Sequence, residues 1–115
     1  MVAPVSVVET PAYLSRAERS MSAEERSAIV DAVASSPESG VLIQGTGGLR
    51  KMRIALAGRG KRGGGRLIYW FHSAGLPAVL LWVFAKNEAS DLTASQRDVL
   101  AKATRDLLTD FGKKP

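Results

Sequence analysis

The chain contains no cysteine in its 115 residues. This absence excludes disulfides, zinc sites built from thiolates and a cysteine nucleophile. Its longest apolar stretch, Leu76–Ala85, is far shorter than the ~20 residues that a membrane-spanning helix needs. The first ten residues lack a basic segment followed by a long apolar run, so we expect no signal peptide. These absences favour a cytoplasmic protein without a membrane partner.

Acidic residues are missing from the middle of the chain. No Asp or Glu occurs between Ser39 and Asn87, whereas this window holds eight Lys or Arg residues. The rest of the chain is net acidic, with eight basic and 11 acidic residues, although the formal charge of the whole is +5. A basic surface on a more acidic scaffold indicates a polyanionic partner, RNA or DNA.

The N-terminal third predicts a strand and two helices. Val5–Val8 is a β-branched run that favours a strand. Thr10, followed by a proline, is typical of a helix N-cap. Ser22 and Glu25 have the spacing of a capping box, which starts a second helix. Pro37 ends that helix, and the charges of this hairpin fit a solvent-facing surface better than a functional one.

The central part predicts a strand with one basic face, preceded by a brief strand at Val41–Ile43. From Leu49, apolar Met52, Ile54 and Leu56 alternate with Lys51 and Arg53. Because side chains alternate between the two faces of a strand, the two cations should lie side by side on one face of a sheet.

Glycines and hydrophobic runs define the rest of the sheet. Gly58–Gly65 is expected to be a mobile loop between two antiparallel strands. Arg66–His72 is rich in aromatic and β-branched residues and is predicted to be the next strand. Ala78–Ala85 is almost unbroken in its hydrophobicity, which indicates a central strand covered on both faces.

A final helix is expected to begin after a second capping box, formed by Thr93 and Gln96. Its predicted apolar stripe is Val99, Leu100, Ala103, Leu107 and Phe111. Gly112 should end it, with residues 112–115 as a disordered tail. The order of elements predicts one α+β domain over residues 1–115: an N-terminal strand, a two-helix hairpin, an antiparallel sheet core of three to four further strands, and a C-terminal helix.

The sequence lacks most standard catalytic constellations. Its single histidine, His72, lies in an aromatic strand and fits a structural or exposed position better than a catalytic one. The glycine-rich segments lack the spacing and the Lys-Ser/Thr pair of a P-loop. The nearby carboxylates match no metal motif. We therefore expect neither a metal nor a cofactor.

The remaining candidate is a set of cations on a rigid sheet: Lys51, Arg53, Arg66 and Lys86. The 2′-hydroxyl of RNA can attack its own adjacent phosphate when the geometry is in line. Arginine suits the charge that develops on the phosphate, and a lysine crowded by other cations can move protons. The alternative is that these cations only grip phosphate, and composition alone favours this simpler interpretation.

Three segments together resemble the HigB-type branch of the RelE superfamily of bacterial toxins. They are GTGGLRKMR, GRGKRGGGRLIYW and AKNEASDLT, in this order and spacing, and the similarity extends over Val7–Leu107. The resemblance implies a RelE-like fold and a ribosome-dependent endoribonuclease that cuts mRNA in the ribosomal A site without a metal. It also implies a cognate antitoxin with a helix-turn-helix domain, through which alone the complex would bind operator DNA.

The resemblance carries roles to individual residues. Lys51 and Arg53 match a basic pair on the second core strand, Arg66 the arginine that contacts the scissile phosphate, and Lys86 a basic position that ends the last strand. Our hypothesis is that Lys86 or Lys51 acts as the base and that Arg66 stabilises the transition state. Further RNA or ribosome contacts are expected from Arg50, Arg59, Lys61, Arg62 and Asn87.

The sequence departs from the better-known RelE pattern at two positions. Asn87 stands where that pattern has a second basic residue, and Thr93 where a tyrosine stacks on the mRNA. These departures leave two alternatives open: a non-cleaving inhibitor of translation that binds RNA or the ribosome, and a catalytically decayed partner of a repressing antitoxin.

Overall fold

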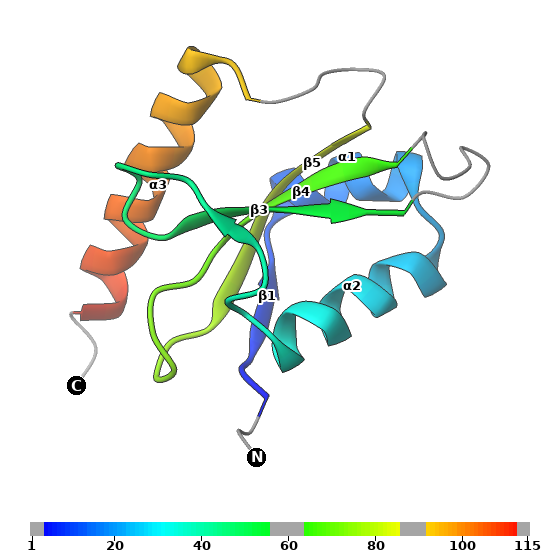
Figure 1. Ribbon diagram of the computed structural model, residues 1–115, viewed down its shortest axis with the longest axis horizontal. Helices are drawn as coiled ribbons and strands as arrows, with labels where there is room; N and C mark the ends of the chain where they lie inside the picture. The colour runs from blue at the N-terminus through cyan, green and yellow to red at the C-terminus, as the bar shows by residue number, and fades with distance from the viewer. Residues whose placement is uncertain (1–3, 56–63, 86–91, 113–115) are drawn as a thin grey trace.

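The computed structural model describes residues 4–55, 64–85 and 92–112 (Figure 1). Five strands form one sheet in the order β1-β5-β4-β3-β2. β2 to β5 pair in antiparallel fashion, whereas β1 joins β5 in parallel. The elements are β1 (Val7–Glu9), α1 (Pro11–Ser20), α2 (Ala23–Ser35), β2 (Val41–Leu42), β3 (Leu49–Ile54), β4 (Gly65–Trp70), β5 (Ala78–Ala85) and α3 (Ala94–Gly112). The predicted α+β class and element order are confirmed.

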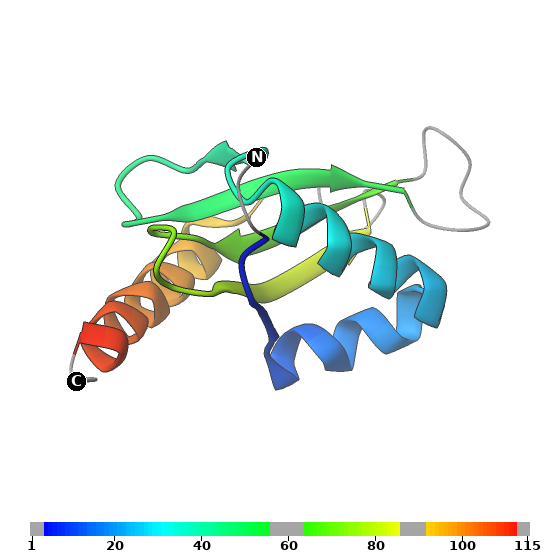
Figure 2. The same cartoon turned by 90° about the horizontal axis from the view of Figure 1, so that it is seen from below.

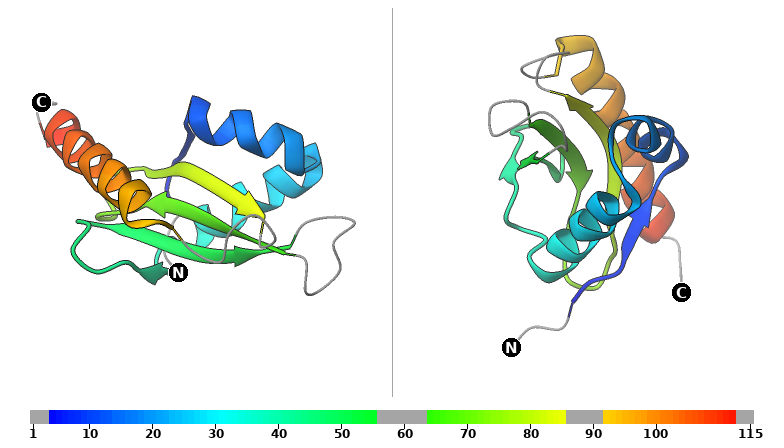
Figure 3. Two further views of the ribbon diagram at one scale, coloured as in Figure 1. Left: turned by 90° about the horizontal axis from the view of Figure 1, so that it is seen from above. Right: turned by 90° about the vertical axis from the view of Figure 1, so that its right-hand side faces the viewer.

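The sheet separates two layers of helix. Helices α1 and α2 cover one face, and α3 lies against the other (Figures 2 and 3). Each face has its own hydrophobic cluster: one joins Tyr13, Val33 and Tyr69, and the other joins Leu49, Trp70 and Leu92, among others. Strand β5 lies between β1 and β4 and is buried along most of its length, as its unbroken hydrophobicity predicted.

The side-chain caps predicted from the sequence are present at the starts of the helices. The Thr10 hydroxyl accepts a hydrogen bond from the Tyr13 backbone N–H at 3.2 Å and lies 2.8 Å from the Leu80 carbonyl, to which it donates. Ser22 and Glu25 form the predicted capping box. Thr93 and Gln96 form the second one, with bonds of 2.9 and 3.1 Å. Because these bonds satisfy N–H groups that a helix cannot satisfy itself, they fix where each helix begins.

Three predicted features need correction. Strand β4 begins at Gly65 rather than at Arg66, because Gly65 pairs with Ile54 and Ala85. The same strand ends at Trp70 rather than at His72, because Trp70 is the last residue that pairs with β3 and β5. Beyond it, the Phe71 N–H donates to the Gly48 carbonyl of the turn before β3 at 3.0 Å. Val99 does not belong to the buried stripe of α3: it is 68% exposed, and Ala101 and Thr104 are buried instead.

Two other expectations fall partly outside the description. Residues 58–63 of the glycine-rich loop and Leu56 lie outside the described ranges. Gly112 is the last residue of α3, and residues 113–115 of the expected tail are not described either.

The segment GTGG forms the turn between β2 and β3. Gly48 has a φ of 121°, and a Cβ there would meet the Phe71 carbonyl oxygen at 2.9 Å. The Trp70 ring donates to the Gly47 carbonyl at 3.1 Å, and the buried Thr104 hydroxyl of α3 donates to the Thr46 carbonyl at 2.8 Å. These glycines therefore serve a tight turn on which α3 is anchored, not a phosphate loop.

Two buried tyrosines differ in how their hydroxyls are satisfied. The Tyr69 hydroxyl donates to the Pro37 carbonyl at 2.7 Å and accepts from the Gly40 N–H at 2.9 Å. The hydroxyl of Tyr13, which is fully buried, has no hydrogen-bond partner among the described residues. Burial, with a smaller contribution from the Glu9 carboxylate, raises the pKa of Tyr13 to about 12.

We expect Tyr13→Phe and Tyr69→Phe to have opposite effects on stability. Tyr69→Phe leaves a backbone N–H and a carbonyl without partners and should lower the free energy of unfolding by about 1–3 kcal/mol. Tyr13→Phe removes an unpaired polar group and should leave this free energy unchanged or higher. Urea unfolding of both variants measures the difference, and equal losses would contradict this account.

Tyr13 should also contribute to alkaline unfolding. A pKa of about 12 in the folded state exceeds the ordinary value of 10.0, so ionisation of Tyr13 favours the unfolded state. The free energy of unfolding is therefore unaffected by this group below pH 10 and falls as pH rises from 10 toward 12. Two pKa units correspond to roughly 2–3 kcal/mol. Unfolding of the wild type and Tyr13→Phe, compared from pH 8 to 12, should show a shallower decline in the variant; parallel curves would contradict it.

Candidate nucleic-acid interface

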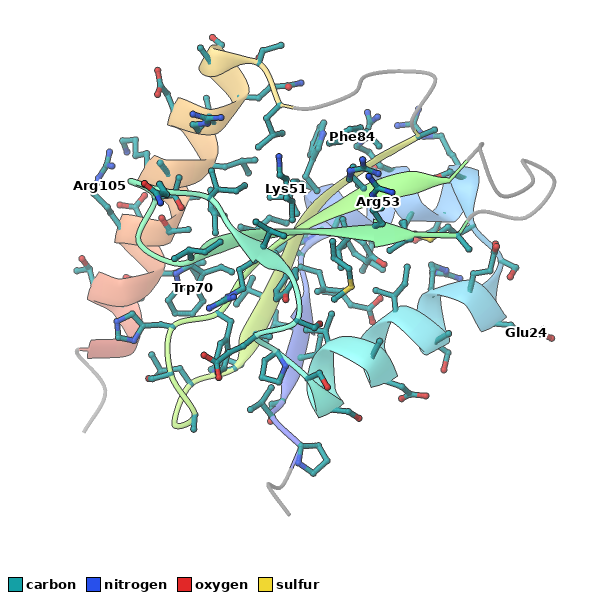
Figure 4. The ribbon with its side chains drawn as sticks, viewed as in Figure 1. Glu24, Lys51, Arg53, Trp70, Phe84 and Arg105 are labelled. Carbon is teal, nitrogen blue, oxygen red and sulfur yellow. The ribbon has the colours of Figure 1, made fainter. Side chains whose placement is uncertain are left out.

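Strands β3 and β4 bring three of the predicted cations to one face of the sheet. Arg53 pairs directly with Arg66 in the antiparallel register. Lys51 pairs with Ile68, which is the next pair on the same face of the sheet. Side chains of directly opposed residues lie about 4.5–5.5 Å apart at Cβ. Figure 4 shows Lys51 and Arg53 on the same side of the sheet. The alternation read from the sequence is therefore confirmed for this strand.

No described carboxylate forms an ion pair with Arg53 or Arg66. The sequence has no acidic residue between Ser39 and Asn87, and Glu24 of α2 points outward, away from Arg53 (Figure 4). Like charges directly opposite each other destabilise a sheet. The fold thus holds two guanidinium groups at a cost in stability, and an anion bound between them would remove that cost.

A hollow of about 390 Å³ opens beside these cations. The three cations line it, together with Met52 of β3, Val41 of β2 and Ser39, which precedes β2. Arg53 is exposed, and Lys51 and Arg66 are half-buried. Since Arg66 comes from a central strand, its backbone is fixed while its guanidinium remains accessible. The arrangement suits a phosphate group, which arginine binds in a planar, two-pronged geometry.

Two aromatic side chains, which the sequence alone did not mark as candidates, extend this face across β5. Phe84 pairs with Arg66, and Trp82 pairs with Ile68, so both share a face with the cations. The Arg16 guanidinium of α1 lies 4.5 Å from the centre of the Trp82 ring. The alternation of Trp82 and Phe84 along β5 was visible in the sequence, but the uniform hydrophobicity of the strand concealed which face each residue takes.

Arg50 does not join this group. It alternates with Lys51 and therefore points to the opposite face. One guanidinium nitrogen, Nη1, donates to the carbonyls of Glu38 at 3.1 Å and Gly40 at 2.9 Å, and the side chain is 16% exposed. Arg50 thus fixes the segment that leads into β2. Its basic neighbours in sequence gave no sign of this difference.

The structure leaves five other candidate residues undescribed. Arg59, Lys61, Arg62, Lys86 and Asn87 lie outside the described ranges.

His72 is exposed just beyond β4 and stacks on Trp70, with ring centres 6.2 Å apart. Among the described residues, no three His, Asp or Glu side chains gather as metal ligands would. Across these same ranges, no helix has the length and apolar character needed to span a membrane.

We expect Arg50→Met and Arg53→Met to separate the two kinds of cation. Arg50→Met removes a charged donor from two carbonyls and should lower the free energy of unfolding by about 1.5–3 kcal/mol. Arg53→Met relieves repulsion from Arg66 and should keep or raise stability, within about 0.5 kcal/mol. Urea unfolding of both variants tests this. A larger loss for Arg53→Met than for Arg50→Met would contradict the assignment.

A comparison with known protein families identifies the family of this chain. A family model described as the RelE toxin of the RelE/RelB toxin–antitoxin system matches residues 11–114. The match spans both helical layers and the strands that carry the three cations. A RelE-type toxin is the toxic half of a pair and has an antitoxin as its partner. This chain belongs to the RelE toxin family.

Proposed function

We propose that this toxin is a ribosome-dependent endoribonuclease that cuts mRNA in the ribosomal A site. The observation that carries the proposal is the Arg53–Arg66 pair, with Lys51 beside it, on a face without a described carboxylate partner for either arginine. A site of this kind favours a bound polyanion. Family membership supplies the context in which the polyanion is mRNA.

The cleavage that we propose needs no atom beyond those of RNA and the side chains. The 2′-oxygen attacks the adjacent phosphorus, an O–P bond forms, and the bond from phosphorus to the 5′-oxygen of the next nucleotide breaks. The products are a 2′,3′-cyclic phosphate and a 5′-hydroxyl. The proton of the 2′-hydroxyl passes to a base, and the leaving 5′-oxygen gains a proton.

Each cation has a distinct role in this proposal. Arg66 stabilises the charge that develops on the phosphate oxygens, because its guanidinium is fixed on a central strand and need not reorganise. Arg53 holds the phosphate from the neighbouring strand. Lys51 or Lys86 acts as the base. RNA or ribosome contacts come from Arg59, Lys61, Arg62 and Asn87. Arg50, which donates to the carbonyls of Glu38 and Gly40, stabilises the fold instead.

A cognate antitoxin neutralises the toxin in this proposal. Its helix-turn-helix domain would carry the complex to operator DNA, which the toxin itself does not touch. The basic face would attract an acidic antitoxin segment. The HigB-type subgroup remains part of the proposal, since the family match identifies RelE-type toxins as a whole.

We expect loss of cleavage when the cations are removed one at a time. Arg66→Ala should lower the rate by about 10²–10³-fold, as removal of a transition-state donor does. Lys51→Ala or Lys86→Ala should lower it by about 10²–10⁴-fold, according to which lysine is the base. Primer extension on a defined mRNA in a reconstituted translation system, with and without ribosomes, measures these rates.

The matched control is Arg19→Ala, which removes one positive charge from α1. This helix lies on the other side of the sheet (Figure 2). It should leave the cleavage rate unchanged. Cleavage that survives in both lysine variants would rule out the base assignment, and cuts on naked RNA would overturn dependence on the ribosome. Inhibited translation with intact mRNA would instead identify a non-cleaving inhibitor. No inhibition at all would identify a decayed partner of the antitoxin.

A further inference from the structure

A second hollow, of about 290 Å³, lies where β5 faces the first turns of α3. Its walls are Trp82 from β5 and Ser95, Gln96, Val99 and Leu100 from α3. Trp82 is half-buried, and Val99 is 68% exposed although the periodicity of α3 predicted it to be in the core. The hollow is therefore bounded mainly by apolar side chains that remain accessible.

Arg16 holds the indole of Trp82 in place. Its Nε donates to the Val83 carbonyl at 2.7 Å, on the part of β5 that extends beyond its pairing with β1. The same guanidinium lies 4.5 Å from the centre of the Trp82 ring. A cation bound to an aromatic ring in this way restricts the ring. The indole thus borders the hollow as a fixed, flat wall.

The hollow is adjacent to the cations on the same face of the sheet. The register places Lys51, Ile68 and Trp82 on one row, and Arg53, Arg66 and Phe84 on the next. Trp82 is therefore the diagonal neighbour of Arg66, roughly 7–8 Å away between backbones. A phosphate at Arg66 and the base of an adjoining nucleotide at Trp82 are compatible with this spacing.

We propose that the hollow between Trp82 and α3 is a nucleobase subsite of the cleavage site. The base stacks on the indole of Trp82, beside Val99 and Leu100, and Arg16 acts as a positioning residue for the ring. The side-chain oxygen of Gln96 accepts a hydrogen bond in the capping box. Its amide nitrogen takes no part in that cap and can donate to a base edge. This inference rests on the proposed function and extends it from the phosphate to the neighbouring base.

The surroundings of the hollow favour a nucleobase over a protein side chain. Stacking on an aromatic ring is the usual way in which proteins hold single-stranded RNA, and it acts together with cations that follow the backbone. Both components are present here on one continuous sheet face: the ring of Trp82 and the guanidinium groups of Arg53 and Arg66. The hollow therefore lies where a nucleotide bound by its phosphate would project its base.

The test compares Trp82→Leu, Trp82→Phe and Val99→Glu in the reconstituted translation system. Three otherwise identical mRNAs are used. One is intact, and each of the other two has a single abasic nucleotide, either on the 5′ side or on the 3′ side of the cleaved bond. Loss of a stacked base costs about 5- to 150-fold in binding. We expect Trp82→Leu and Val99→Glu to raise KM on intact mRNA by a factor in this range, and Trp82→Phe to retain most of the wild-type value.

The abasic mRNAs distinguish stacking from a structural effect. On the mRNA that lacks the stacked base, wild type and Trp82→Leu should have the same KM, because the group that the indole contacts is gone. Arg16→Gln should give a smaller loss that also disappears on this mRNA. A defect of Trp82→Leu that persists equally on every abasic mRNA would overturn the subsite.

Val99→Glu decides the matter if Trp82→Leu does not fold, because Val99 is a surface residue. Its matched control is Thr109→Glu, which adds the same charge to the exposed side of α3 away from the hollow. Normal cleavage by Val99→Glu would overturn the subsite while leaving the proposed function intact. Normal cleavage combined with loss of neutralisation by the antitoxin would identify the hollow as a protein-binding site instead.

Discussion

The pairing of β3 with β4 is the constraint on which the basic face of the sheet depends. It sets Arg53 opposite Arg66 and Lys51 opposite Ile68, and it turns Arg50 to the other side. Because side chains alternate strictly along a strand, a slip of one residue would bury Lys51 and Arg53 under α2 and expose Met52 and Ile54. The hydrophobic clusters on both faces thus hold the cations in position, although the cations themselves oppose the pairing.

The two faces of the sheet differ in how completely helices cover them. The face under α1 and α2 holds the larger hydrophobic cluster, and there Tyr69 and Arg50 bind the backbone around residues 37–40. The face toward α3 is only partly covered: of the α3 side chains whose burial is described, Ala101 and Thr104 are buried, and Thr104 anchors the helix to the turn before β3. Incomplete cover leaves both hollows, the cations and the half-buried Trp82 available to a ligand.

Arginine serves three purposes in this small fold, and the surroundings decide which. Arg50 is nearly enclosed and satisfies carbonyl groups, so it stabilises the backbone. Arg53 and Arg66 repel each other on an accessible face, which suits a phosphate that neutralises both. Arg16 reaches around the edge of β5 and restrains an aromatic ring. Charge alone therefore says little about the role of a cation here.

The sequence by itself determined the α+β class, the helix starts at Thr10, Ser22 and Thr93, and the shared face of Lys51 and Arg53. These features depend on local capping and on alternation, which neighbouring residues fix among themselves. The tertiary structure alone decided that Arg53 faces Arg66, that Arg50 binds backbone carbonyls on the opposite face, and that Val99 and Trp82 border an open hollow. Strand register and helix docking join residues far apart in the chain, so no local pattern could reveal them.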